Sequence, residues 1–127
     1  MLTIEQALQE SIEIFDALIR TGEDKRATLE SSGLTHFICY KNMCPLCQYV
    51  VQEAGIGEGE YLHNKECEEY CPAANELALC DSRKGSVYEK WVDAFYRNES
   101  KTIKIKRAIE VRKALAAAQS RVLEEVS

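Results

Sequence analysis

The sequence has no long apolar run, no export signal and no internal repeat. None of its apolar stretches approaches the ~20 residues that a membrane-spanning helix requires. The first ten residues, MLTIEQALQE, carry acidic side chains where a secretory signal carries basic ones, so we expect a cytoplasmic protein. With 127 residues and no linker-like stretch, the chain is expected to form a single domain.

What is present is an ordinary globular composition with an uneven distribution of charge. Hydrophobic residues make up 46% and charged residues 29% of the chain, which excludes a disordered tail. The net charge is −5, but residues 1–80 contain 5 basic and 14 acidic residues, whereas residues 101–127 contain 7 basic and 3 acidic ones. This polarity bears on solubility and on the choice of partner rather than on the fold.

Helical patterns occupy both ends of the chain. Apolar residues recur three and four positions apart over residues 4–19, which predicts an amphipathic helix. Thr3 and Gln6 fit a capping box at its start, and Gly22 supplies a stop. A second short helix is expected over residues 24–31.

Two further helices are predicted near the C-terminus. Ser86 begins the first of them with another capping box, followed by an apolar stripe that we expect in the core: Tyr88, Trp91, Val92 and Phe95. The longest helix is expected over residues 100–125, where five apolar residues follow a 3-4-3-4 spacing: Ala108, Val111, Leu115, Ala118 and Val122. Such a seam packs closely on the N-terminal helix or on a second copy of the chain, so a homo-oligomer is one alternative.

The middle of the chain combines a short strand with helical pieces. Residues 35–40, THFICY, are aromatic and β-branched and form the best strand candidate. Helical patterns resume after Cys47 and after Pro72. The predicted fold class is therefore mainly α with a small β element. Its parts are a helical N-terminal part (1–33), a cysteine-rich centre like a zinc knuckle (34–85) and C-terminal helices (86–127).

Six cysteines in a chain without an export signal indicate thiols or metal ligands rather than disulfides. A CxxC pair is followed after 19 residues by a CxxxC pair, close to the layout of a structural zinc site. The predicted ligands of one Zn²⁺ are four of the five residues Cys44, Cys47, Cys67, Cys71 and Cys80, with Cys80 as the substitute for one member of the second pair. Cys39 is expected to be a buried residue of the strand.

Two other kinds of centre use the same cysteines. A strand, then CPLC, then a helix is the local order of a glutaredoxin-like redox site with Cys44 as nucleophile. A glutaredoxin would begin with a strand and carry a Gly-Gly turn, which this chain lacks. Cys71 followed by Pro72 is reminiscent of an iron–sulfur motif, although the spacing does not match a ferredoxin. His63 is a further ligand candidate, and His36 is expected in the strand or on the surface.

The sequence also contains a basic stretch, KTIKIKRAIEVRK, which could lie along nucleic-acid phosphates. Its basic residues are Lys101, Lys104, Lys106, Arg107, Arg112 and Lys113. A solvated helix face explains the same pattern, and no recognised nucleic-acid motif accompanies it.

The stretches MCPLCQYV, CEEYCPAANELALC and SVYEKW together resemble small cysteine-rich proteins that are common in bacteriophage genomes. The resemblance covers residues 36–97 and implies a zinc site and a phage setting, but no activity. This chain spaces its second pair CxxxC rather than CxxC, which leaves the fourth ligand open.

We therefore expect a non-enzymatic, zinc-stabilised binding or regulatory protein that contacts a host or phage macromolecule in the host cytoplasm. Nucleic-acid binding by the basic helix is the first alternative, and thiol–disulfide chemistry at CPLC is the second.

Overall fold

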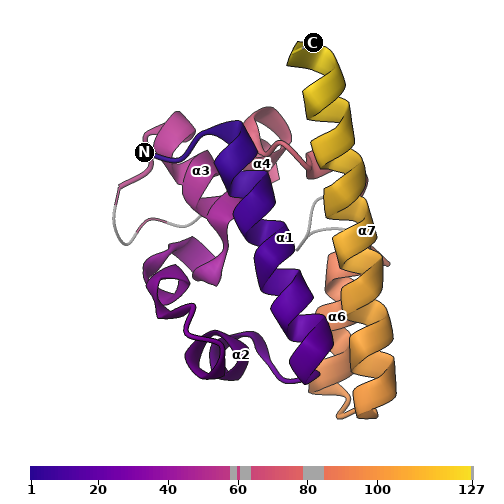
Figure 1. The fold of residues 1–127 in the computed structure, drawn as a ribbon. Coiled ribbons are helices and arrows are strands. Elements are labelled where there is room, and N and C mark those ends of the chain that lie inside the picture. The colour runs from indigo at the N-terminus through magenta and orange to yellow at the C-terminus, as the bar shows by residue number, and fades with distance from the viewer. Residues whose placement is uncertain (58–59, 61–63, 79–84, 127) are drawn as a thin grey trace.

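Two long helices that run in opposite directions organise the molecule (Figure 1). They are α1 (Ile4–Thr21) and α7 (Lys101–Val126), and they lie side by side. The fold is a computed structural model, which describes residues 1–57, 60, 64–78 and 85–126.

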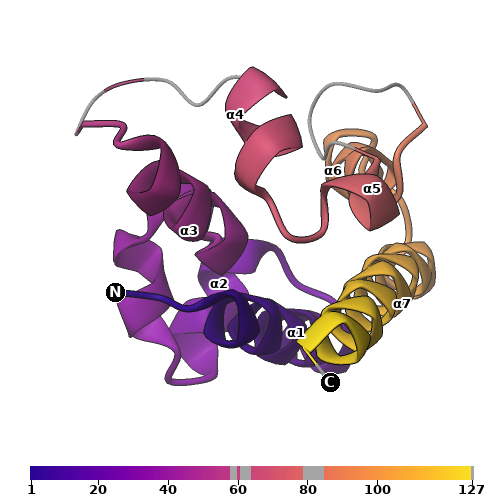
Figure 2. The same ribbon diagram turned by 90° about the horizontal axis from the view of Figure 1, so that it is seen from above.

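Shorter helices surround this pair. In chain order they are α2 (Lys25–Ser31), the 3₁₀ helices η1 (Thr35–Cys39) and η2 (Lys41–Met43), α3 (Pro45–Ala54), α4 (Asn64–Tyr70), α5 (Ala74–Leu77) and α6 (Val87–Tyr96). Helix α6 packs against α7. Helix α3 packs against the side of α1 that is away from α7, so α1 lies between α3 and α7 (Figure 2). The predicted mainly helical class is confirmed.

Helix α1 is buried over more of its circumference than its apolar stripe predicts. Ser11, Ile14 and Ala17 are buried together with the expected apolar residues, whereas Ile4 and Ile19 at the two ends are only half-buried. The reason is that α1 has neighbours on two sides, so that side chains flanking the stripe are also covered.

The small-residue seam of α7 is covered by the chain itself. Ala108 and Ala118 are at most 1% exposed, and the rest of the seam is also buried. Polar pairs along the same interface fix its register, because Arg112 Nε donates to Asp16 Oδ1 at 2.8 Å and Gln119 Nε2 donates to Gln9 Oε1 at 2.8 Å. The sequence allowed this seam to pack on the N-terminal helix or on a second copy of the chain. In the structure it packs on the N-terminal helix, α1.

The predicted helix boundaries follow from capping. Thr3 and Gln6 form the reciprocal capping box, with N–H···O distances of 2.8 and 3.1 Å. Gly22 ends α1 in the left-handed conformation, with φ 68°, and a Cβ there would collide with the Lys101 side chain at the start of α7. Ser86 Oγ accepts the Glu89 N–H at 3.1 Å, as expected for the start of α6.

The strand predicted over residues 35–40 is wrong. Thr35–Cys39 forms η1, in which the Tyr40 N–H donates to Phe37 O at 3.1 Å. The part of the chain that the structure describes contains no strand, so this segment has nothing with which to form a ladder. The 3₁₀ turn still buries Phe37, whose ring lies 5.6 Å from that of Tyr40, and leaves Cys39 exposed rather than buried as we had predicted.

None of the described helices combines the length and the apolar character needed to cross a membrane.

Ser11 provides a test of the packing around α1. Ser11 is 4% exposed, and its buried hydroxyl has no hydrogen-bond partner among the described residues. We predict that Ser11→Ala raises the free energy of unfolding by about 1–2 kcal/mol, because it removes an unsatisfied buried hydroxyl and improves helix propensity. Ser120→Ala, at an exposed position within α7, should gain only about 0.5 kcal/mol from propensity. Urea denaturation measures both free energies of unfolding. Equal gains in the two variants would contradict the view that the Ser11 hydroxyl is buried without a partner.

Candidate metal and thiol centre

The CPLC turn forms the start of α3. Cys44 is extended, with φ −135° and ψ 118°, and Pro45 occupies the first helical position, where its missing N–H breaks no hydrogen bond. The Cys44 carbonyl accepts the Gln48 N–H at 2.9 Å. Asn42 Nδ2 lies 3.7 Å from Cys47 Sγ. Backbone N–H groups of Leu46 and Cys47 donate to the Cys44 sulfur, so both sulfurs of the turn lie near N–H donors.

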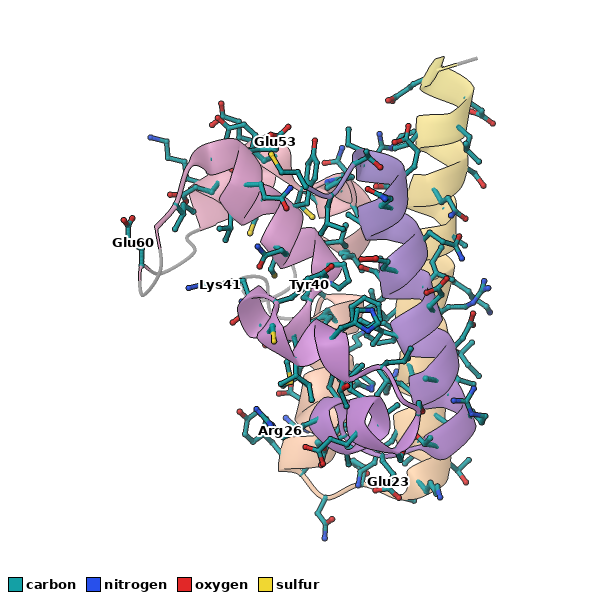
Figure 3. The ribbon with its side chains drawn as sticks, turned by 60° about the vertical axis from the view of Figure 1, so that its left-hand side comes forward. Glu23, Arg26, Tyr40, Lys41, Glu53 and Glu60 are labelled. Atoms are coloured by element: carbon teal, nitrogen blue, oxygen red, sulfur yellow. The ribbon has the colours of Figure 1, made fainter. Side chains whose placement is uncertain are left out.

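The turn before Cys44 is held from several directions. Asn42 adopts a left-handed conformation, φ 56°, which asparagine tolerates better than most residues. Lys41 Nζ donates to the Glu60 carbonyl at 2.5 Å, and Figure 3 shows the Lys41 side chain extending toward the side of the molecule on which Glu60 lies. Tyr40 Oη donates to Glu10 Oε1 of α1 at 3.5 Å. These contacts fix the approach of the chain to the first cysteine pair.

The second cysteine pair lies on and just after α4. The Cys71 N–H donates to the Cys67 carbonyl at 3.0 Å, so the two residues are one helical turn apart. Helix α4 contacts α3, and Cys44 and Cys67 both raise the pKa of the Cys71 thiol. The fold therefore places the two cysteine pairs on or beside contacting helices.

These thiols do not form a complete metal site by themselves. In residues 1–57, 60, 64–78 and 85–126, no three His, Cys, Asp or Glu side chains are placed to hold one metal ion. Cys80, the predicted substitute ligand, and His63 lie outside the described residues. The five described cysteines form no disulfide. The donors fit zinc in kind, but a complete site needs a closer approach of the two pairs or the participation of Cys80.

The half-buried thiols of Cys44 and Cys71 ionise very differently. A hydrogen bond with the Cys47 side chain lowers the pKa of Cys44 to about 6; burial opposes the shift, whereas the Lys25 ammonium adds to it. Burial raises the pKa of Cys71 to about 12, and the neighbouring Cys44 and Cys67 add to the rise. At neutral pH the centre thus combines a thiolate with a thiol that only a nearby cation would deprotonate.

Lys25 is the residue of this centre that sequence reasoning missed. It is the first residue of α2, only 8% exposed, and its Nζ donates to Tyr88 Oη at 3.0 Å. Burial alone would lower the pKa of Lys25, but Tyr88, Cys44 and Cys47 raise it overall. No local pattern in the sequence distinguishes it from a solvated lysine.

Arg121 of α7 fixes the segment that follows the second pair. Its guanidinium donates to both Glu76 oxygens, at 2.8 and 3.0 Å, and to the Pro72 carbonyl at 2.5 Å. Because Pro72 directly follows Cys71, this contact ties the second cysteine pair to the long C-terminal helix. Arg121 lies outside the predicted basic stretch, so its role was not foreseen.

His36 gains no ligand role from its described contacts. It is exposed and its ring lies beside that of Phe37, with ring centroids 3.9 Å apart and the planes tilted by 43°.

The residues of the basic stretch differ in their contacts. Arg107 pairs with Glu110 at 3.0 Å, and Arg112 pairs with Asp16. Lys104 Nζ lies 4.7 Å from the centre of the Phe95 ring. Three of the six predicted residues therefore serve intramolecular contacts, whereas Lys101, Lys106 and Lys113 are exposed.

Comparisons of this chain with protein-family models, with curated proteins and with solved structures gave no match. What the centre does must therefore be argued from its own residues.

The difference in ionisation between the thiols gives a pH-dependent prediction. In protein treated with a chelator, the alkylation rate of Cys44 should rise with pH and reach half its maximum near pH 6, since the thiolate is the nucleophile. Cys71 should remain unmodified throughout the neutral range. Peptide mass spectrometry after short iodoacetamide pulses measures both rates, and a Cys44 rate that still climbs steeply above about pH 8, near the value of an ordinary thiol, would contradict the prediction.

Proposed function

We propose that this chain is a non-enzymatic binding protein whose cysteine centre binds one structural Zn²⁺. The ligands are four of the five residues Cys44, Cys47, Cys67, Cys71 and Cys80. The observation that supports the proposal is the packing of α4, which carries Cys67 and leads to Cys71, against α3, which begins at the CPLC turn.

Helix α4 provides a second reason for a metal. It has seven residues, and none of residues 65–70 is buried. Helices of this length are unstable alone and normally depend on a buried apolar face. A zinc ion shared with α3 would supply the missing stabilisation, because structural zinc contributes about 10–16 kcal/mol to small metal-dependent folds.

The same ligand set argues against catalysis at the metal. Four thiolates fill the tetrahedral coordination of Zn²⁺ and leave no position for an activated water. The proposed role of the ion is to connect elements rather than to act on a substrate. A structural rather than catalytic ion supports a binding role, and we propose that the bound partner is another protein.

A protein partner would find a suitable surface beside the centre. A groove of about 480 Å³ lies between α6 and the turn before α3, and Tyr96 at its edge is 85% exposed. The residues that line it are Asp24, Lys25, Asn42, Met43, Tyr88, Trp91, Val92, Phe95 and Tyr96. Aromatic and methionine side chains are enriched at the centres of protein interfaces, which supports a binding role.

The test of the metal is native mass spectrometry with elemental analysis on protein purified without added metal or chelator. We expect one zinc per chain in the wild type and in Cys39→Ser, which removes an exposed thiol outside the centre. Cys47→Ser should lose the metal. Iron with acid-labile sulfide would instead indicate a cluster, and a metal-free wild type would contradict the proposal.

Hydrogen exchange of the same variants tests what the ion holds together. In Cys47→Ser, α4 should lose its amide protection because none of residues 65–70 is buried, whereas α1 and α7 should keep theirs. Unchanged protection of α4 would show that the ion, if bound, does not stabilise this helix.

Thiol–disulfide exchange is the second candidate, favoured by the hydrogen bond between Cys44 and Cys47 and the lowered pKa of Cys44. In that reaction the Cys44 thiolate would attack a substrate disulfide and release one substrate thiol. Cys47 would then attack Cys44 and release the second thiol, leaving a Cys44–Cys47 disulfide, so that two electrons pass to the substrate. Rapid alkylation of Cys44 in protein as isolated would favour this reaction, and protection of Cys44 would favour the metal.

A further inference from the structure

Lys25 is a buried cation that needs an explanation. An ammonium group removed from water is unfavourable by several kcal/mol unless an anion or several acceptors replace the solvent. Lys25 is 8% exposed, and its long side chain would reach water from most positions on a helix. Its environment must therefore compensate the charge.

No carboxylate of the described residues forms an ion pair with Lys25. The adjacent Asp24 is engaged elsewhere, because its Oδ1 accepts the Ala27 N–H at 2.8 Å and caps α2. Lys25 Nζ donates to Tyr88 Oη at 3.0 Å and lies 5.3 Å and 5.8 Å from the ring centres of Tyr88 and Trp91. These neutral groups orient the ammonium but do not cancel its charge.

Lys25 shares a small cavity with a cysteine. This cavity of about 20 Å³ is lined by Lys25 and Cys44 together with Tyr88 and Pro45. In agreement with this placement, Cys44 and Cys47 both raise the pKa of Lys25. A lysine on α2 is thus directed at the start of α3.

We propose that Lys25 is the counter-cation of the cysteine centre and sets its affinity for a divalent metal ion. The metal part of this inference rests on the proposed zinc site. Four thiolates around Zn²⁺ carry a net charge of −2, which is unfavourable in a buried place, and one fixed ammonium halves it. Lys25 acts through the sulfurs and is a positioning residue rather than a ligand.

If Lys25 had a purely structural role, its variants would show a different pattern of zinc affinities. If the Lys25–Tyr88 hydrogen bond only joined α2 to α6, then removing the tyrosine hydroxyl would have the same effect as removing the ammonium. Tyr88→Phe keeps the charge and deletes the bond, whereas Lys25→Met deletes both and keeps the length of the side chain. Lys25→Arg keeps the charge, and Lys113→Met removes an exposed lysine on α7 as a matched control.

The experiment measures the zinc dissociation constant of these full-length proteins by competition with a chromophoric chelator. We expect Lys25→Met to weaken zinc binding ~10–100-fold, as removal of groups that support metal ligands commonly does. Lys25→Arg, Tyr88→Phe and Lys113→Met should stay near the wild type. Equal affinity of Lys25→Met and the wild type, or equal losses in Lys25→Met and Tyr88→Phe, would overturn the inference. Lys25→Gln replaces Lys25→Met if the latter does not fold.

A second measurement separates this inference from the proposed function. If the wild type binds no zinc, the proposed function fails, and the alkylation rate of Cys44 at neutral pH then decides the role of Lys25. A rate that falls several-fold in Lys25→Met, but not in Lys113→Met, would still support Lys25 as the counter-cation of Cys44. An unchanged rate would overturn it.

Discussion

The burial of α1 between α3 and α7 is the constraint on which the rest of the structure depends. On one side, the small residues of the α7 seam allow close packing, and Ala7 and Leu8 of α1 are fully buried. On the other side, α1 receives α3 and with it the CPLC turn. The terminal helices thus have a core of their own, to which the cysteine-rich segment is attached through α3.

The cysteine centre lies among elements that the core buries to different degrees. Leu46, Val50 and Leu77 of the middle segment are buried, so α3 and α5 are anchored by ordinary packing. Helix α4 lies between them with no buried residue at positions 65–70, and it carries Cys67 and leads to Cys71. Zinc would therefore be needed at α4 rather than throughout the middle of the chain. Lys25 of α2 and Arg121 of α7 reach the centre from outside the cysteine-rich segment, one from each side of it in the chain.

Local signals in the sequence were sufficient for most helices. The capping pair Thr3 and Gln6, the stop at Gly22 and the cap at Ser86 act within a few residues, so their effects can be read without knowledge of neighbours. The strand over residues 35–40 failed for the opposite reason. Strand formation needs a pairing partner elsewhere in the chain, and aromatic side chains are equally well buried by a 3₁₀ turn that packs Phe37 into the core.

The sequence by itself determined the helices, the apolar faces and the two spaced cysteine pairs, because periodicity, caps and donor spacing are properties of adjacent residues. Only the tertiary structure decided that the α7 seam is internal and that Arg112 pairs with Asp16 of α1. It also decided that Lys25 is buried and shares a cavity with Cys44, although its local sequence is that of an exposed lysine. Burial and these contacts depend on residues far apart in the chain, which the packing of α1 against α2, α3 and α7 brings together.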